Sequence, residues 1–290
     1  IGSLKALSGS YLRAAAFVGL IVAFVQPLTG INSIMFYAPV VFEQLGIGEN
    51  AAMVQTIAVG LVSVVFTIIA LSLIDRIGRR PLLLVGLCLV IASLCLSAYG
   101  FHSARYLLLE DDIATLAMAG NIDAAALMPL AGQEFLSDVE FKRALVDSLG
   151  FDAARAAEGD LMVAAAEINP WLIIVGVMGL VAAFNLSIGP IMWVMLSEVF
   201  PIAVRSVAIT GCALFTSLLN YFVQQSFPWQ LANWGAANVF LFYAACVVVG
   251  LIGVYFKVPE TKGKSIEEIE DEFRAGWRGS IKAEPERAAG

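Results

Sequence analysis

Charged residues, histidine and paired cysteines are all scarce in this sequence, and each scarcity excludes a class of protein. Asp, Glu, Lys and Arg make up 14% of the 290 residues and the mean hydropathy is +0.85, whereas about 25% of a soluble domain is charged. A chain this apolar does not fold with water as its main solvent. The net charge of −7 comes mostly from acidic residues in one hydrophilic insertion and in the C-terminal tail, and no segment is basic enough for nucleic acid, so no nucleic-acid partner is expected.

The residues of common catalytic and metal centres are missing as well. His102 is the only histidine, and no H-E-x-x-H, G-x-S-x-G or P-loop motif occurs. The four cysteines lie inside apolar runs rather than in C-x-x-C pairs, which favours small buried side chains over a disulfide or a metal site. The sequence therefore predicts no catalytic residue, no metal and no cofactor, and a protein that is not an enzyme.

Six long apolar runs occupy most of the chain. A helix needs about 20 apolar residues to cross roughly 30 Å of hydrocarbon. Runs of this length lie at residues 14–42, 52–74, 81–102, 170–197, 204–228 and 235–258. An all-α membrane protein with six transmembrane helices is therefore predicted, in the inner or plasma membrane.

Basic residues in the connections predict the orientation of these helices. One side collects Lys5, Arg13, the cluster at 76–80, Arg205 and Lys257, whereas the basic residues of the other side lie in an insertion rich in Asp and Glu. Because Lys and Arg accumulate on the cytoplasmic side, both ends are predicted to be cytoplasmic. The expected units are a cytoplasmic lead-in (1–13), a three-helix unit (14–102), an extracytoplasmic insertion (103–168), a second three-helix unit (169–258) and a cytoplasmic tail (259–290).

The insertion is expected to be a solvated cover or spacer, with a dedicated ligand or partner site as the alternative. Ser137 and Glu140 form a capping box, and Gly150 gives a helix stop. Apolar positions between them, at Phe141, Leu145 and Leu149, complete the pattern of a short amphipathic helix. Residues 275–290 are predicted to be disordered.

Two of the apolar runs are interrupted, the first at residues 26–30 (QPLTG) and the fourth at Gly189-Pro190. Proline removes a helix hydrogen bond and glycine permits a bend, so both helices are expected to be kinked near mid-membrane. Breaks in the first helix of two three-helix units indicate an inverted repeat with a substrate site near the midplane. A kink that serves packing alone is the alternative.

Amide and aromatic side chains lie beside these breaks. Gln26 and Asn32 flank Gly30, Phe36 shares a helix face with Asn32, and Trp193 follows Gly189 by four residues. Amides bond to the hydroxyls of a sugar, while an aromatic ring covers its apolar C–H face. The alternative makes the two amides interhelical contacts and Trp193 a core or interface residue.

Charged residues gather at the ends of helices on the predicted cytoplasmic side. Asp75, Arg79 and Arg80 lie in the turn between the second and third runs, and Glu198 and Arg205 bracket the turn between the fourth and fifth. Carboxylates and guanidinium groups at such positions form bidentate pairs, which one conformation makes and another breaks. Simple anchoring by positive charge is the alternative.

The motifs around these residues follow one another along the chain. Residues 26–37 read QPLTGINSIMFY, 75–80 DRIGRR, 189–193 GPIMW, 197–201 SEVFP with Arg205 after them, and 258–263 VPETKG. This series resembles the helix-7, loop, helix-10 and C-terminal signatures of the sugar porter family in the major facilitator superfamily. The resemblance covers residues 14–272 except the insertion, which is longer than the family's usual connection between helices 9 and 10.

The resemblance implies alternating access by two six-helix domains around a central sugar site. This chain is similar to the C-terminal half alone, a 3+3 inverted repeat, and its Ile-Gly-Ser-Leu start without Met is interpreted as that of a piece of a longer protein. The implied partners are a monosaccharide, the lipid bilayer and a missing N-terminal six-helix domain. A coupled proton is left open, because the proton-coupling Asp of family symporters lies in the absent first helix.

The resemblance also implies individual roles. Gln26, Asn32 and Trp193 would contact the sugar, and Phe36 and Tyr37 would form an aromatic pair that helps to close the outer side.

On the fifth helix of this chain, Thr216 or Asn220 occupies a position where the family often has Gln or Asn, and we include Asn220 among the sugar-binding residues. Pro27, Phe36 and Ser63 depart from the Gln, Tyr and Asn of the family pattern, which leaves the identity of the sugar open.

The sequence therefore predicts monosaccharide transport by alternating access, as symport or facilitated diffusion. The alternatives are a porter of another small solute, such as a polyol or an organic acid, and a sensor on the same scaffold that binds sugar without transporting it.

Overall fold

The computed structural model describes residues 10–35, 51–119, 124–264 and 268–269. Six helical spans in this part are long and apolar enough to cross a membrane, as predicted. They are α2 (Ser10–Leu28) with α3 (Ile31–Met35), α5 (Ala51–Ile77), α6 (Arg79–His102), α11 (Pro170–Leu186) with α12 (Ile188–Val199), α13 (Ile202–Trp234) and α14 (Ala236–Lys257). Phe36, Tyr37 and the predicted disordered segment 275–290 lie outside the described residues.

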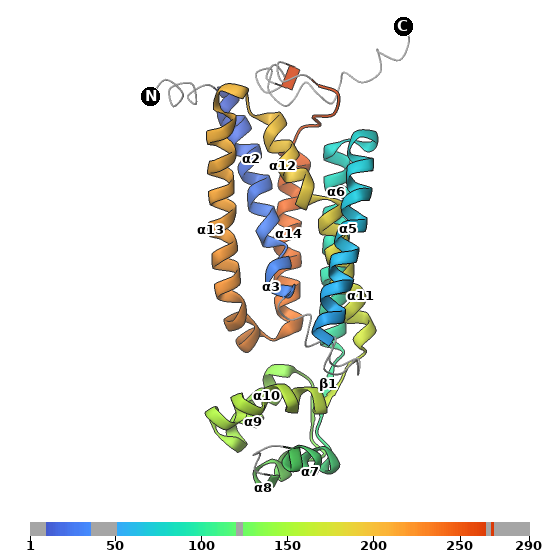
Figure 1. Cartoon of the computed structure of the whole chain (residues 1–290). Coiled ribbons are helices and arrows are strands. Elements are labelled where there is room, and N and C mark those ends of the chain that lie inside the picture. The colour runs from blue at the N-terminus through green and yellow to red at the C-terminus, as the bar shows by residue number, and fades with distance from the viewer. Residues whose placement is uncertain (1–9, 36–50, 120–123, 265–267, 270–290) are drawn as a thin grey trace.

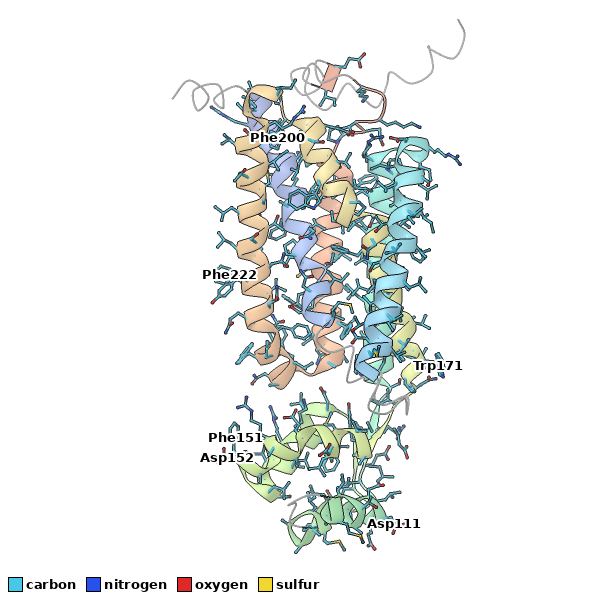
Figure 2. The ribbon with its side chains drawn as sticks, viewed as in Figure 1. Asp111, Phe151, Asp152, Trp171, Phe200 and Phe222 are labelled. Atoms are coloured by element: carbon cyan, nitrogen blue, oxygen red, sulfur yellow. The ribbon has the colours of Figure 1, made fainter. Side chains whose placement is uncertain are left out.

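The six spans form one upright bundle (Figure 1). α6 packs against α11 and α14, and α2 packs against α13 and α14, around a shared apolar core. Phe222 and Trp171 are 63% and 66% exposed and point away from the bundle (Figure 2). Large apolar side chains on the outer surface are costly in water but suit contact with lipid.

Both predicted interruptions are confirmed. The first separates α2 from α3 at Gly30, and the second separates α11 from α12 at Ser187, whose φ and ψ are −131° and −99°. The second break thus precedes Gly189-Pro190. Proline collides with the carbonyl four residues earlier, here that of Leu186, which disfavours a continuous helix and accounts for the break at this point. Pro190 itself lies in the first turn of α12, where no N–H is needed.

Gly30 has a backbone conformation and a neighbour that both require glycine. Its φ is +69°, and an added Cβ would lie 2.9 Å from Cγ of the buried Tyr243 ring. The Tyr243 hydroxyl donates a hydrogen bond to Gln230 Oε1 at 3.0 Å, which holds the ring in place. The break in the first span is therefore supported from α14 and α13.

The Gly30→Ala variant is expected to lower the free energy of unfolding by about 1–2 kcal/mol, because alanine is strained at positive φ. Thermal unfolding in detergent measures the effect. Gly211→Ala on α13 is the matched control, since nothing lies within 4 Å of its added Cβ and alanine favours a helix by about 0.5–1 kcal/mol. Equal shifts in the two variants would contradict this account of Gly30.

Between α6 and α11 the chain forms a small subdomain below the bundle (Figure 1). Its elements are β1 (Arg105–Leu107), α7 (Glu110–Ala119), α8 (Ala124–Leu127), a 3-10 turn η3 (Met128–Leu130), β2 (Glu134–Phe135), α9 (Asp138–Leu149), α10 (Phe151–Ala165) and β3 (Ala166–Glu167). The strands form an antiparallel sheet in the order β2-β1-β3, with Tyr106 opposite both Phe135 and Ala166. The all-α prediction missed this sheet because strands of two or three residues show no alternation.

The predicted amphipathic helix is confirmed as α9. Ser137 accepts a hydrogen bond from the Glu140 N–H at 3.1 Å, and Gly150 ends the helix at a φ of +79°. Phe141 and Leu145 are buried in the core of the subdomain.

One carboxylate connects the subdomain to the bundle. Asp138, in the first turn of α9, accepts a hydrogen bond from the Ala236 N–H at 3.1 Å. Ala236 begins α14, so Asp138 caps a membrane helix at its positive end. Burial, with the nearby Asp138 charge as a smaller cause, raises the pKa of Tyr106.

Candidate functional site

The break between α2 and α3 exposes polar groups inside the bundle. Gln26 lies one turn before Gly30, and its backbone carbonyl accepts a hydrogen bond from the Thr29 hydroxyl at 2.8 Å. The Gln26 Oε1 atom is buried and accepts no hydrogen bond from any residue that the structure describes. A buried acceptor without a donor costs about 1–3 kcal/mol, so this oxygen favours a donor from outside the described chain.

Asn32 and Asn220 meet at an exposed contact between α3 and α13. Asn32, on α3, donates from Nδ2 to Oδ1 of Asn220, on α13, at 3.0 Å. The two residues are 188 positions apart in the chain. Each amide has a second polar group, an acceptor on Asn32 and a donor on Asn220, which suits it to bind adjacent hydroxyls of a ligand.

Thr216 has a different role from Asn220. Its hydroxyl is buried and donates to the Ala23 carbonyl at 3.1 Å, so it joins α13 to α2. Of the two alternatives on α13, Asn220 is therefore the one paired with a predicted site residue.

No contact between described residues places Trp193 beside these amides. It lies on α12 and is 47% exposed, with its ring accessible rather than packed in the core. Phe36 and Tyr37 lie outside the described residues, so the predicted aromatic pair is not placed.

A further polar group, which the sequence analysis missed, lies at the end of α11. Asn185 donates to the Ser63 hydroxyl at 3.2 Å and to the Val181 carbonyl at 2.8 Å, while Thr67 donates to Asn185 Oδ1 at 3.5 Å. A signal was available: an asparagine inside an apolar run, two residues before the break at Ser187. Ser63 and Thr67 lie on α5, so this group joins α5 to α11.

Arg79 is the centre of the predicted charge cluster. It is the first residue of α6, and α6 begins at the end of the bundle where α2 begins and α14 ends, which we name the terminal end (Figure 1). Its guanidinium donates to Glu198 at 2.9 and 3.2 Å, to Asp75 at 3.0 Å and to the Ile74 carbonyl at 3.1 Å. The Arg79 and Glu198 side chains are 14% and 26% exposed and Asp75 is 77% exposed. The Glu198 pair is therefore less screened by water and the stronger of the two.

The segment after α14 completes this cluster. Glu260 accepts hydrogen bonds from the backbone N–H groups of Arg79 and Arg80 at 3.0 and 3.1 Å, and so caps the start of α6. Thr261 donates to Glu198 at 2.6 Å. Gly78 permits this approach, because its φ is +102° and an added Cβ would lie 2.6 Å from the Glu260 carboxylate.

Glu260 and Thr261 belong to the VPETKG motif, but the sequence did not predict that they join the charge cluster. Their spacing does not indicate that the segment after α14 lies beside the start of α6.

Arg80 and Arg205 take other positions. Arg80 donates from its side chain to the Tyr255 carbonyl at 2.7 Å, with the ring of Tyr255 5.8 Å from its guanidinium carbon. Arg205 donates to the Phe200 carbonyl at 3.1 Å, and no ion pair joins it to Glu198 in the described chain. Arg205 thus fastens the turn between α12 and α13 through the backbone.

A family model described as "Sugar (and other) transporter" matches residues 1–126 and 157–273. The chain belongs to the sugar porter family of the major facilitator superfamily. The family match leaves out residues 127–156, which hold α9 and the beginning of α10.

Relatives in this family are transporters. The "Arabinose-proton symporter" of Bacillus subtilis is 31% identical over 270 residues, which are 93% of this chain and 45% of the symporter. The "Solute carrier family 2, facilitated glucose transporter member 10" of Mus musculus is 29% identical over 293 residues, which cover 93% of this chain and 54% of the transporter. The chain spans about half the length of the curated relatives it matches.

A solved structure shows the same fold. The proton:xylose symporter XylE bound to 6-bromo-6-deoxy-D-glucose superposes with a TM-score of 0.58 at 25% identity, over 89% of this chain and 42% of the symporter. The predicted fold, six transmembrane helices with the 3+3 architecture of a half of a major facilitator superfamily transporter, is confirmed.

Proposed function

We propose that this chain is one six-helix half of a monosaccharide porter, which works by alternating access together with a second six-helix domain. The observation that carries the proposal is the Asn32–Asn220 pair beside the break at Gly30. Polar groups and irregular backbone inside a membrane bundle are tolerated where they line a cavity. Gln26, with its buried acceptor, and Trp193, with its accessible ring, complete the proposed sugar site, and Phe36 and Tyr37 are proposed to close it.

Family members support a monosaccharide as the substrate. The relatives are described as transporting arabinose, xylose or glucose. Because a proton symporter and a facilitated glucose transporter match this chain about equally well, symport and facilitated diffusion both stay open.

The terminal end of the bundle is proposed to face the cytoplasm and the 103–168 subdomain the outside, since Lys and Arg favour the cytoplasmic side. On this orientation, the charge cluster of Asp75, Arg79 and Glu198 closes the cytoplasmic side of the porter when the sugar site is open outward. Both ends of the chain are then cytoplasmic. The proposed units are those given by the sequence, 1–13, 14–102, 103–168, 169–258 and 259–290.

Uptake by proteoliposomes tests the proposal. The complete porter, this chain joined to its second six-helix domain, is expected to take up a radiolabelled pentose or hexose with saturable kinetics, while the six-helix chain alone gives none because it supplies one wall of the cavity. Competition by polyols or organic acids but not sugars would favour another small-solute porter. Sugar binding without flux would favour a sensor, and a response of uptake to an imposed pH gradient separates symport from facilitated diffusion.

A further inference from the structure

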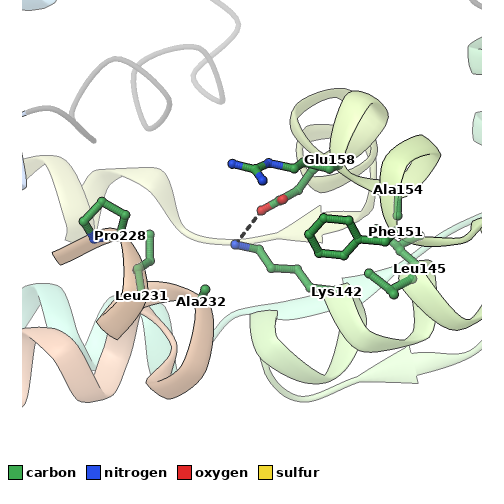
Figure 3. Close-up of a pocket in the computed structure, with 10 residues that line it drawn as sticks. Lys142, Leu145, Phe151, Ala154, Glu158, Pro228, Leu231 and Ala232 are labelled. Atoms are coloured by element: carbon green, nitrogen blue, oxygen red, sulfur yellow. Dashed lines mark ion pairs between the residues drawn. The ribbon is translucent and has the colours of Figure 1, made fainter. Parts of the chain in front are cut away.

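A cavity of about 370 Å³ lies between the subdomain and the end of α13 (Figure 3). It is far along the bundle from the charge cluster, and its α9 wall falls within the residues that the family match leaves out. Helices α9 and α10 supply one wall and the last turns of α13 the other. The residues that decide its chemistry are Lys142, Phe151, Arg155, Glu158, Pro228 and Leu231.

Arg155 gives this cavity a net positive charge. Lys142 pairs with Glu158 at 2.8 Å, so these two charges cancel. Arg155 forms no ion pair with any residue that the structure describes, and its guanidinium carbon lies 6.0 Å from the centre of the Phe151 ring. The insertion at 103–168 contains four basic and twelve acidic residues. Arg155 lines the cavity and favours an anionic group beside it, whereas the acidic residues of the insertion repel anions and confine this preference to the surroundings of Arg155.

The length of α13 places the cavity at the level of the lipid headgroups. Its 33 residues extend about 50 Å at 1.5 Å per residue, whereas the hydrocarbon core is about 30 Å thick and the bilayer with headgroups about 40–45 Å. Residues 228–234 at its end therefore lie beyond the hydrocarbon. Trp229 and Trp234, 59% and 39% exposed, are the residue type that marks this interface.

The wall opposite Arg155 is apolar. Pro228, Leu231 and Ala232 of α13 line it, and Phe151, 64% exposed, projects from the subdomain side. A ligand that fits both walls has an anionic head and an apolar body. A phospholipid has this form and is present at this depth.

We propose that this cavity binds the headgroup of an anionic phospholipid. The phosphate pairs with Arg155, and the glycerol backbone of the lipid lies against Pro228 and Leu231 of α13. The lipid thereby joins the subdomain to the bundle beside the Asp138 cap of α14. This site is independent of the proposed transport of sugars.

Native mass spectrometry of the complete porter in detergent, titrated with phosphatidylglycerol or phosphatidylcholine, tests the site. Wild type is expected to retain one phosphatidylglycerol in preference to phosphatidylcholine. Arg155→Gln is expected to weaken phosphatidylglycerol binding about fivefold, as for one basic residue near anionic lipid. Ala232→Phe, which fills the apolar wall without changing charge, is expected to weaken it as well.

Arg143→Gln is the matched control, because Arg143 is exposed on the same helix α9 and does not line the cavity. It removes the same charge and is expected to leave binding unchanged. Equal binding by wild type and Arg155→Gln, or an equal loss in Arg143→Gln, would overturn the site. Displacement of the lipid by millimolar glycerol phosphate or inorganic phosphate, with the same dependence on Arg155, would overturn the lipid assignment in favour of a soluble anion.

Discussion

Asn32→Ala in the complete porter is expected to weaken monosaccharide binding by about 5- to 150-fold. The variant removes the donor and the acceptor that the Asn32 amide offers to a desolvated sugar hydroxyl. The expected loss of binding free energy is about 1–3 kcal/mol. It also leaves Asn220 Oδ1 without the donor that Asn32 supplies at 3.0 Å. Isothermal titration or competitive uptake measures the affinity.

The same preparation separates a binding role from a packing role. If Asn32 binds sugar, the melting temperature without sugar changes little, because the Asn32–Asn220 bond is exposed and solvent replaces the lost donor. If Asn32 only joins α3 to α13, the fold weakens by about 0.6–2 kcal/mol while the affinity stays as it was. Asn233→Ala is the matched control, since Asn233 is an exposed amide on α13 with a local bond to the Trp229 carbonyl at 2.8 Å. It is expected to change neither quantity.

Features with a local cause could be predicted from the sequence. The six spans follow from run length, the break at Gly30 from glycine and proline, and α9 from its capping box and Gly150 stop. Each depends on residues within a few turns of one another. The position of the second break shows the limit of such reasoning, because the motif at Gly189-Pro190 was identified while its effect falls at Leu186 and Ser187.

Features that depend on contacts between distant segments could not be predicted in the same way. Glu260 caps α6 only because α14 ends beside it, 181 residues after Arg79. Asn185 meets Ser63 only because α11 packs on α5. The β2-β1-β3 sheet is too short to leave a pattern, and the cavity beside Arg155 depends on where the subdomain lies against α13. Residue types and motifs thus indicated which polar residues were candidates. Which of them pair with one another could be seen only in the packed bundle.

Replacing a polar residue that has several partners is expected to change the ratio of the outward-open to the inward-open form of the porter. Arg79 is the strongest case, since its guanidinium joins α5, α6 and α12 through Asp75, Ile74 and Glu198. In the proposed mechanism these bonds hold the cytoplasmic side closed while the sugar site is open outward. Their loss leaves the partly buried Glu198 carboxylate with the Thr261 hydroxyl as its remaining described partner.

Arg79→Gln is therefore expected to shift the complete porter toward the inward-open form by about 1–3 kcal/mol, or roughly 5- to 150-fold in the ratio of the two states. Accessibility of single cysteines placed near the two ends of the bundle measures the shift: labelling should rise at the terminal end and fall at the subdomain end. Arg76→Gln, three residues earlier, removes the same charge from an exposed side chain that forms no ion pair among the described residues, and should leave the labelling pattern unchanged. Identical labelling in wild type and Arg79→Gln would make the cluster an anchor rather than a gate, because a charge that both states hold equally well shifts no equilibrium between them.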